Sequence, residues 1–150
     1  MKIKIYTDGA CRANGTKNAL GGWAYAIIYN DELRLEEWGN EKETTNNRME
    51  MMAVVEALKN FTDLDEEIVV CTDSAYIHNC MKQKWYVNWQ RNGWVNATRE
   101  PVKNKDLWEQ IIPYFSNPLI SFEKIRGHSG DKWNEYVDKL AVKAAKALEE

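Results

Sequence analysis

A short run of uninterrupted apolar residues, Ile68-Val69-Val70-Cys71, constrains the fold of this chain more than any other segment. Strands that are solvated on one face alternate apolar and polar residues, whereas strands buried on both faces are apolar throughout. The run is also rich in β-branched residues, which favour strands. We therefore expect a central strand in a sheet that helices cover on both faces.

The start of the chain predicts a meander of three strands. Residues 3–7 alternate in the pattern of a strand, and the pattern stops at Asp8, which precedes a glycine and indicates a turn. Two further strands are predicted over residues 23–29 and 33–38, on either side of the turn signal Asn30-Asp31.

The rest of the chain alternates helical and strand patterns. Helices are predicted from Asn47 to about Phe61, from Ser74 to about Met81, over residues 103–114 and from Trp133 to about Leu148, with another strand over residues 119–125. The element order is β-β-β-α-β-α-α-β-α, with a loop between the second and third helices. This order implies an α/β fold, in which helices lie on both faces of a mixed sheet.

The length of 150 residues, with 44% hydrophobic residues, predicts a single globular domain over residues 1–150. The chain lacks a signal-peptide pattern at its start and the ~18 consecutive apolar residues of a membrane span. The cysteines Cys11, Cys71 and Cys80 are odd in number and have no C-x-x-C spacing, which argues against a disulfide framework or a zinc site. We expect a protein of the reducing cytoplasm.

Four acidic residues, Asp8, Glu50, Asp73 and Asp138, each lie beside the start or end of a predicted element or on its core-facing side. Two like charges about 4 Å apart repel by roughly 4 kcal/mol at an effective dielectric of about 20, so converging carboxylates need protons, water or cations. Hard, oxygen-seeking ions such as Mg²⁺ are their natural occupants. If the four acids converge, they form a divalent-metal site.

Two of these acids also have ordinary structural interpretations. Asp8 could simply be the turn residue before Gly9. Glu50 occupies the third helical position of a capping box that begins at Asn47. However, Glu50 also lies on the apolar side of its helix, four residues before Val54, where an ionised glutamate is seldom buried without a partner.

The other two acids have structural interpretations of the same kind. Asp73 could cap the following helix, although Ser74 could do so instead. Its position at the carboxyl end of a central strand is where α/β sheets open their ligand crevice. Asp138 flanks the core stripe of the last helix and could pair with Lys139 or remain half solvated. These interpretations serve each acid alone, whereas a metal site accounts for all four.

His128 lies in a turn between Gly127 and Gly130, where the backbone is free to move. An exposed histidine in such a turn is usually inert. Beside a metal cluster it would suit proton transfer, because the ordinary histidine pKa lies near neutrality. His78, in the middle of a predicted helix, is interpreted as structural.

The net charge of −3 argues against a strong nonspecific nucleic-acid binder, but the charges are unevenly placed. The segment from Lys82 to Lys105 contains six basic residues and one acid. It also contains the aromatic residues Trp85, Tyr86, Trp89 and Trp94. Basic residues interleaved with aromatics suit a phosphate backbone with stackable sugars and bases. A solvated loop above buried tryptophans is the alternative.

Six motifs follow one another along the chain: Thr7-Asp8-Gly9-Ala10-Cys11, Thr44-Thr45-Asn46-Asn47-Arg48-Met49-Glu50, Thr72-Asp73-Ser74, Gly93-Trp94, Pro101-Val102-Lys103-Asn104 and Gly127-His128-Ser129-Gly130. In this order, and with Asp138 in the last helix, the chain closely resembles ribonuclease H type 1, also called ribonuclease HI, over almost its full length. The resemblance implies the ribonuclease H-like five-stranded mixed sheet. It also implies an endonuclease that hydrolyses the RNA strand of RNA–DNA hybrids and leaves 5′-phosphate and 3′-hydroxyl ends.

The resemblance implies a role for each acid. Asp8, Glu50, Asp73 and Asp138 match the metal-binding acids of the family, and His128 matches its mobile histidine, implicated in proton handling or product release. Two Mg²⁺ ions, for which Mn²⁺ is a substitute, would bridge the scissile phosphate at ~3.5–4 Å from each other. Glu50 would also contact a ribose 2′-hydroxyl, the group that distinguishes RNA from DNA.

The resemblance further implies contacts with both strands of the hybrid. Cys11 and Asn14 match residues that line the RNA minor groove, and Asn46 and Asn47 match amides that reach both strands. On the DNA side, Thr45 and Asn104 match a phosphate pocket, and Trp85 matches the aromatic that packs on deoxyribose. The segment 82–103 corresponds to a basic protrusion that holds the hybrid in some members. We expect a monomer, with no hybrid-binding module before the first strand.

Some residues depart from the family pattern. Glu43 stands where well-known relatives have an arginine near the phosphate pocket, and Ala75 stands where an amide is usual. Gln90 and Asn92 occupy positions of the protrusion that are often lysine or arginine. Each lost phosphate contact removes close to one unit from the salt dependence of binding. We therefore expect weaker and less salt-sensitive hybrid binding than in a fully basic relative.

Two other function classes are compatible with parts of the sequence. A noncatalytic hybrid-binding domain would keep the fold, but it gives no reason for the four acids and His128 together. An integrase or junction resolvase would share the acidic cluster. The amide-rich segment 44–47 and Trp85 argue against such an enzyme, because a protein that acts only on DNA has no use for 2′-hydroxyl recognition.

Overall fold

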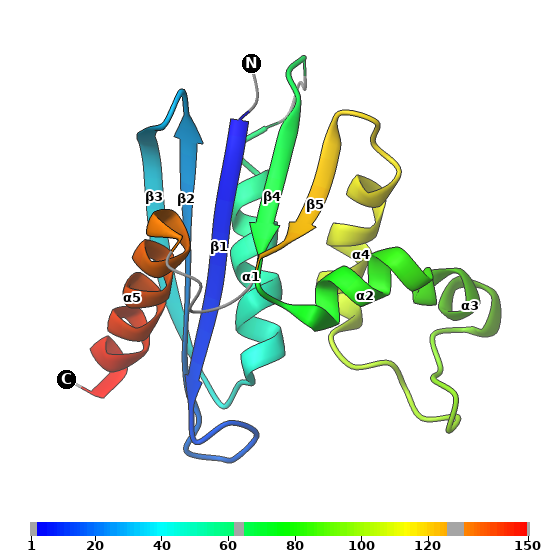
Figure 1. Cartoon of the computed structure of the whole chain (residues 1–150). Coiled ribbons are helices and arrows are strands. Elements are labelled where there is room, and N and C mark those ends of the chain that lie inside the picture. Colours follow the sequence, from blue (N-terminus) through cyan, green and yellow to red (C-terminus); the bar gives the residue numbers. More distant parts are fainter. Residues whose placement is uncertain (1–2, 62–64, 126–130, 150) are drawn as a thin grey trace.

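The computed structural model describes residues 3–61, 65–125 and 131–149 (Figure 1). The described residues form five strands, five α-helices and a terminal 3-10 turn. The strands are β1 (Ile3–Arg12), β2 (Leu20–Tyr29), β3 (Glu32–Lys42), β4 (Ile68–Thr72) and β5 (Ile120–Lys124). The helices are α1 (Asn46–Leu58), α2 (Ala75–Gln83), α3 (Trp85–Asn92), α4 (Lys105–Phe115) and α5 (Lys132–Lys146), followed by η1 (Ala147–Glu149).

The strands form one mixed sheet in the order β3-β2-β1-β4-β5. β1 lies in the middle, antiparallel to β2 and parallel to β4, and β5 extends the parallel half. Every residue of β4 is buried, so the interpretation of its apolar run as a strand covered on both faces is confirmed. The predicted five-stranded mixed α/β fold is confirmed as well.

Helices cover both faces of this sheet (Figure 1). Because side chains alternate between the two faces along each strand, each face has its own hydrophobic core. Ile5 and Val70 face the core shared with α1 and α4, which contains the fully buried Trp108. The neighbouring Tyr6 and Val69 face the smaller core under α5. The sheet is thereby held between two layers, and the carboxyl ends of β1 and β4 are fixed relative to α1 and α5.

Two expectations about element boundaries are wrong. β1 does not stop at Asp8 but continues to Arg12, because it pairs with β2 as far as Leu20. The loop expected between the second and third helices contains α3. This helix forms because its aromatic side chains, among them Trp85 and Trp89, pack against the main core. Single-sequence patterns miss such a short helix, since tertiary packing supplies most helical stability.

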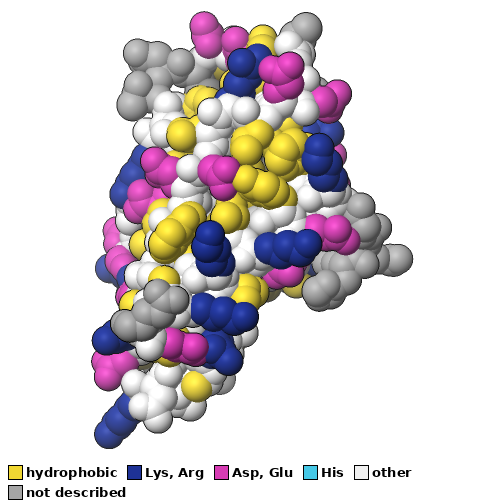
Figure 2. Space-filling model, turned by 90° about the vertical axis from the view of Figure 1, so that its left-hand side faces the viewer, with side chains coloured by type: hydrophobic (Ala, Val, Ile, Leu, Met, Phe, Trp, Pro, Cys, Tyr) yellow, Lys and Arg dark blue, Asp and Glu magenta, His cyan; other side chains and the backbone are white. Residues whose placement is uncertain are grey.

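The face formed by α5 and the edge strand β3 mixes acidic, basic and hydrophobic side chains (Figure 2). Its large exposed hydrophobic residues are Leu35, Trp38 and Val142. None of the described helices is both long and apolar enough to cross a membrane.

Glycines allow both covering helices to touch the sheet. A Cβ atom on Gly22 of β2 would collide with the Ala141 carbonyl oxygen and the Ala145 backbone nitrogen of α5. No side-chain movement can relieve a collision with backbone atoms. The glycine therefore sets the distance between α5 and the sheet.

We predict that Gly22→Ala displaces α5 and lowers the free energy of unfolding by about 1–3 kcal/mol, the usual cost of overpacking. Gly15→Ala is the control, because a Cβ there has open space and only the φ of +78° opposes it; it should cost about 1 kcal/mol. Chemical denaturation followed by circular dichroism measures both. Equal stabilities of Gly22→Ala and the wild type would contradict the close approach.

Candidate active site

Three carboxylates from three elements converge at the carboxyl end of β4. One oxygen each of Asp8 on β1, Glu50 on α1 and Asp73 after β4 lies within 4.8 Å of the other two. Asp138 on α5 lines the same cleft, whose volume is about 360 Å³. Residues that are far apart in the sequence therefore meet, as a metal site requires.

Asp8 is held in the middle of the sheet rather than in a turn. Only 3% of its surface is exposed, and its Oδ1 atom accepts a hydrogen bond from the Gly9 backbone nitrogen at 2.9 Å. β1 pairs with β2 at Asp8 itself and with β4 as far as Tyr6, so the Asp8 carboxylate is held beside the end of β4. A central strand thus positions the first of the four candidate metal ligands.

Glu50 reaches the cleft because α1 crosses β1 in direct backbone contact. A Cβ atom on Gly9 would collide with the Glu50 backbone nitrogen and the Met49 carbonyl carbon. The expected capping box is wrong, since Thr45 is the N-cap and its Oγ1 atom accepts from the Arg48 nitrogen at 3.1 Å. The Glu50 side chain is therefore not used to cap its helix, and its Oε2 atom is buried without a partner among the described residues.

Asp73 also remains free for the cleft. Ser74, not Asp73, caps α2, because its Oγ atom accepts a hydrogen bond from the Ile77 nitrogen at 3.2 Å. The Thr72 hydroxyl accepts a bond from the Ser74 nitrogen at 3.1 Å and fixes the turn. Of the two candidate caps in the sequence, Ser74 therefore caps the helix and Asp73 does not.

Asp138 is carried to the cleft by α5, whose approach to the sheet depends on Gly22. The N-cap of α5 is Asp131, which accepts hydrogen bonds from two backbone nitrogens of the first turn. Asn134 and Glu135 line the cleft beside Asp138. We did not single out these two residues in the sequence, although Asn134 precedes Asp138 by one helical turn and so shares its face.

Burial and crowding determine the electrostatics of the cluster. Burial, followed by the charge of Asp73, raises the pKa of Asp8 to about 8. Burial and then the charges of Asp8 and Asp73 raise the pKa of Glu50 well above its ordinary value. Without a cation, the cluster therefore retains protons near neutrality. Carboxylate oxygens suit hard divalent ions, so the cluster could hold a metal ion.

His128, the fifth catalytic residue that we expect, lies outside the described residues, as do the flanking Gly127 and Gly130.

The expected RNA-side and amide residues lie around the beginning of α1. The Asn46 backbone nitrogen donates to Asn14 Oδ1 at 2.9 Å, which joins the loop after β1 to the start of the helix. Asn46 and Asn47 are exposed, and Asn46 lines the cleft. The half-buried Cys11 directs its thiol toward the Thr44 carbonyl oxygen at 3.7 Å. The segments that carry Cys11, Asn14 and Asn46 are therefore joined beside the carboxylates.

Thr45 and Asn104 are linked by Arg48, a residue whose importance the sequence did not indicate. The Arg48 backbone is bonded to Thr45, and its Nη1 atom donates to Asn104 Oδ1 at 3.4 Å. The guanidinium also donates two bonds to Asp106, at 3.0 and 2.7 Å, and lies 3.5 Å from Glu41. The bonded Arg48 lowers the pKa of Asp106. Two acids thus compensate the charge of this arginine.

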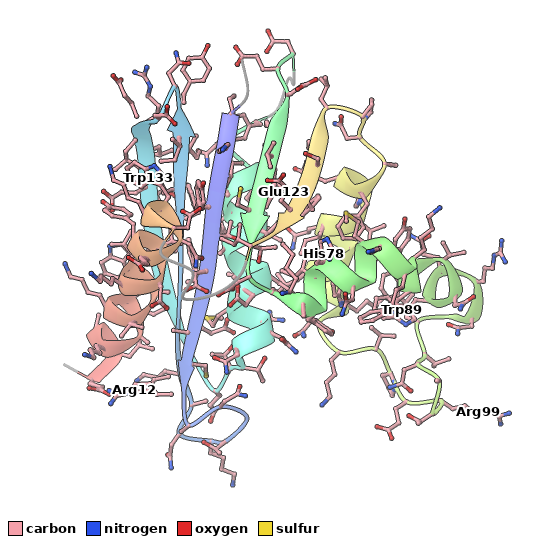
Figure 3. All side chains as sticks on the ribbon, in the orientation of Figure 1. Arg12, His78, Trp89, Arg99, Glu123 and Trp133 are labelled. Carbon is pink, nitrogen blue, oxygen red and sulfur yellow. The ribbon has the colours of Figure 1, made fainter. Side chains whose placement is uncertain are left out.

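The basic aromatic segment, from Lys82 to Lys105, has both the packed tryptophans and the exposed basic residues that its sequence indicated. Trp89 packs against Trp85, Trp94 and the core residue Trp108, with ring centroids 5.7–6.2 Å apart. The surrounding basic residues are exposed, and Arg99 extends from the outer end of the segment (Figure 3). The tryptophans therefore anchor the segment, while its basic residues face solvent.

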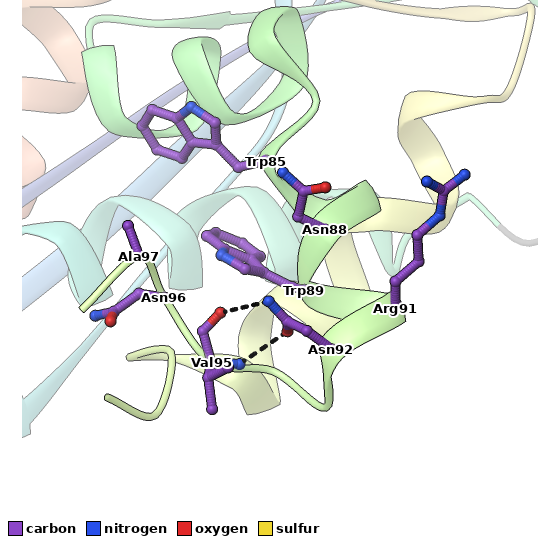
Figure 4. Close-up of a pocket in the computed structure, with 8 residues that line it drawn as sticks. All are labelled: Trp85, Asn88, Trp89, Arg91, Asn92, Val95, Asn96 and Ala97. Carbon is purple, nitrogen blue, oxygen red and sulfur yellow. Dashed lines mark hydrogen bonds between the residues drawn. The ribbon is translucent and has the colours of Figure 1, made fainter. Parts of the chain in front are cut away.

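A hollow of about 470 Å³ lies on this segment, between α3 and the loop that follows it (Figure 4). The rings of Trp85 and Trp89 form part of its wall, and Arg91 lies at its margin. The amide of Asn92 shapes the loop by exchanging two hydrogen bonds with the Val95 backbone, each 3.1 Å long. This concave surface offers aromatic faces and a cation together.

A family model of RNase H matches residues 1–146. The chain belongs to the RNase H family. The Ribonuclease H of Syntrophomonas wolfei subsp. wolfei is 48% identical over 147 residues, which cover 98% of each chain. The Ribonuclease H of Clostridium botulinum is 42% identical over 143 residues, or 95% of each chain. The resemblance inferred from the motifs is confirmed.

Solved structures agree with this assignment. LC9-RNase H1, a type 1 RNase H with the type 2 active-site motif, is 30% identical with a TM-score of 0.80 over 97% of this chain and 72% of that one. LC11-RNase H1, solved in complex with RNA/DNA hybrid, is 25% identical with a TM-score of 0.69 over 99% of both chains. The RNase H fold therefore accounts for the whole described sheet and its helices.

The raised pKa of Asp8 predicts a pH-dependent stability for the metal-free protein. The folded state binds a proton more tightly than the unfolded state, so stability should fall as the pH rises from about 4 to about 8. Asp8→Asn removes this charge and should raise the free energy of unfolding at pH 8 by roughly 2–4 kcal/mol, with less effect at pH 4.

Urea denaturation with a chelator, at several pH values, measures this effect. Asp106→Asn is the matched control, because it also removes one carboxylate charge, but one that is bonded to Arg48 rather than crowded by other acids. Since Asp106 is exposed and its pKa is lowered, this variant should lose less than about 1 kcal/mol, mainly above pH 4. A stability of Asp8→Asn below that of the wild type at pH 8 would contradict the prediction.

Proposed function

We propose that this protein is an endoribonuclease that hydrolyses the RNA strand of RNA–DNA hybrids in a metal-dependent reaction. The observation that carries the proposal is the convergence of Asp8, Glu50 and Asp73, with Asp138 in the same cleft, within an RNase H fold. The complex of the related LC11-RNase H1 with RNA/DNA hybrid supports the hybrid as substrate. The catalytic domain is proposed to span residues 1–150.

The proposed cofactor is Mg²⁺, with Mn²⁺ as a substitute, and Asp8, Glu50, Asp73 and Asp138 would hold it. The buried Oε2 atom of Glu50, which has no partner in the part of the chain that the structure describes, and the raised pKa of Asp8 support a cation there, because a cation relieves both. When bound, a pair of such ions activates water and stabilises the charge that develops on the departing 3′ oxygen. The products would have 5′-phosphate and 3′-hydroxyl ends.

The chain itself would orient the substrate and transfer protons. Glu50, fixed by the contact of its backbone with Gly9, is proposed to contact a ribose 2′-hydroxyl and so select RNA. His128 is proposed to handle protons or help products leave, on the basis of the family motif in which it lies.

The surface beside the cleft supports recognition of both strands. Cys11, Asn14, Asn46 and Asn47 are proposed to contact the hybrid near the cut, because their segments are joined to one another next to the carboxylates. Amide groups suit the minor groove, where bases and 2′-hydroxyls present both donors and acceptors.

Thr45 and Asn104 are proposed to bind a phosphate of the DNA strand, at a site connected through Arg48. The charge of Arg48 is already compensated by Asp106 and Glu41. This pocket therefore attracts phosphate weakly.

The segment 82–103 is proposed to hold the hybrid beyond the cut. Trp85 would pack on deoxyribose, and the exposed basic residues would attract phosphates. We further propose that the protein acts as a monomer in the cytoplasm. Free thiols support a reducing compartment, since all three cysteines lie among the described residues and none forms a disulfide.

A cleavage assay with end-labelled hybrid, double-stranded RNA and double-stranded DNA tests the proposed function. We expect only the RNA strand of the hybrid to be cut, and only with Mg²⁺ or Mn²⁺. A chelator should abolish cleavage, and Asp8→Asn should reduce it by roughly a thousandfold or more, because several kcal/mol of transition-state stabilisation are lost. Circular dichroism verifies that the variant is folded.

Two outcomes of this assay would overturn the proposal. Equal attack on double-stranded DNA would favour a polynucleotidyl transferase. Metal-independent binding of the hybrid without any cleavage would favour a noncatalytic binding domain.

Glu43 offers a direct test of the weak phosphate pocket. We predict that Glu43→Arg tightens hybrid binding and steepens the dependence of log Kd on log salt by close to one unit, as expected for one added phosphate contact. The control is Glu32→Arg, an identical charge reversal at the opposite end of β3, which should leave the slope unchanged. Fluorescence anisotropy with a chelator present measures both slopes. Identical slopes for the two variants would exclude a phosphate near Glu43.

A further inference from the structure

Asn134 is a buried polar residue in the wall of the carboxylate cleft. Only 3% of its surface is exposed, and it lines the cleft together with Asp8 and Asp138. Its Oδ1 atom is buried and has no hydrogen-bond partner among the described residues. Leaving a buried polar atom unpaired costs about 1–3 kcal/mol, so such an atom in a functional cleft calls for a partner.

The surroundings of Asn134 restrict what this partner can be. Its backbone nitrogen donates to Asp131 Oδ1 at 3.1 Å, which fixes the residue in the first turn of α5. Asp138 follows one turn later on the same face of the helix. With a cation bound, the four acids would be ionised and could only accept hydrogen bonds, so none of them could donate a bond to the Asn134 oxygen. The partner must bring its own proton.

A water molecule bound to a divalent cation meets this requirement. Its oxygen is directed at the metal, and both of its hydrogens are free to be donated. Hydrogen bonds between surrounding side chains and the groups that bind a metal directly orient those groups and tune the affinity of the site.

We propose that Asn134 is a positioning residue that accepts a hydrogen bond from a water bound to the cation held by the four acids. The proposal rests on the proposed function, because it assigns a partner to the same metal site. Asn134 adds an acceptor without adding charge. A further carboxylate at this position would instead repel a neighbour about 4 Å away by roughly 4 kcal/mol.

The test compares Mg²⁺ binding by the wild type, Asn134→Leu and Asn134→Asp, using isothermal titration calorimetry and thermal unfolding with and without Mg²⁺. Leucine has the branching of asparagine but no acceptor, so Asn134→Leu should weaken Mg²⁺ binding about 10–100-fold. Without metal it should unfold at the same temperature as the wild type or higher, because the unpaired oxygen is gone. Asn134→Asp retains the acceptor and should bind Mg²⁺ at least as tightly as the wild type.

A role of Asn134 in holding the fold alone predicts the opposite pattern, in which Asn134→Leu unfolds at a lower temperature without metal and binds Mg²⁺ with unchanged affinity. That result overturns the proposal, as does weaker Mg²⁺ binding by Asn134→Asp. The matched control is Thr44→Val, which should not change Mg²⁺ affinity. It removes another buried oxygen that has no partner among residues 3–61, 65–125 and 131–149 and does not line the cleft.

Cleavage of the hybrid by the wild type separates the two proposals. If the wild type binds Mg²⁺ and cleaves the hybrid while Asn134→Leu binds Mg²⁺ equally well, only the role of Asn134 is overturned. If the wild type neither binds Mg²⁺ nor cleaves the hybrid, the proposed function and the role of Asn134 are both overturned.

Discussion

The direct contact of two helices with the backbone of the sheet is the constraint on which this structure depends. α1 touches β1 at Gly9, and α5 touches β2 at Gly22. Each helix carries acids to the cleft, so the position of Glu50 and Asp138 relative to Asp8 follows from two residues without side chains. A larger residue at either glycine would move a helix away from the sheet and separate the carboxylates.

This convergence opposes the stability of the metal-free protein. Asp8 is buried among other acids, and the site disfavours its charge, because burial and the charge of Asp73 raise its pKa. The two hydrophobic cores on either side of the sheet must offset this repulsion. Positive charge near the cluster is also compensated, because Arg48 is bonded to Asp106. The more distant basic residues lie on the segment 82–103.

Local sequence patterns were most reliable where burial alone decides the structure. The apolar run of β4 and the order of the main elements followed from side-chain periodicity. The errors lie where tertiary contacts outweigh local preference. Asp8-Gly9 has the sequence of a turn, but pairing with β2 extends the strand. α3 forms on a packed aromatic surface, and Thr45 replaces the expected cap at Asn47 because its hydroxyl reaches the Arg48 nitrogen.

The motifs of the chain indicated most of the candidate residues for binding metal and hybrid, because carboxylates, amides and basic aromatic segments have fixed chemistry and the motifs have a recognisable order. Tertiary structure alone decided their geometry. The shared cleft joins residues from separate elements, as does the link from Thr45 through Arg48 to Asn104. The need of the Asn134 oxygen for a partner depends on its burial. Distances between such residues depend on how helices pack on the sheet, and no local pattern contains that information.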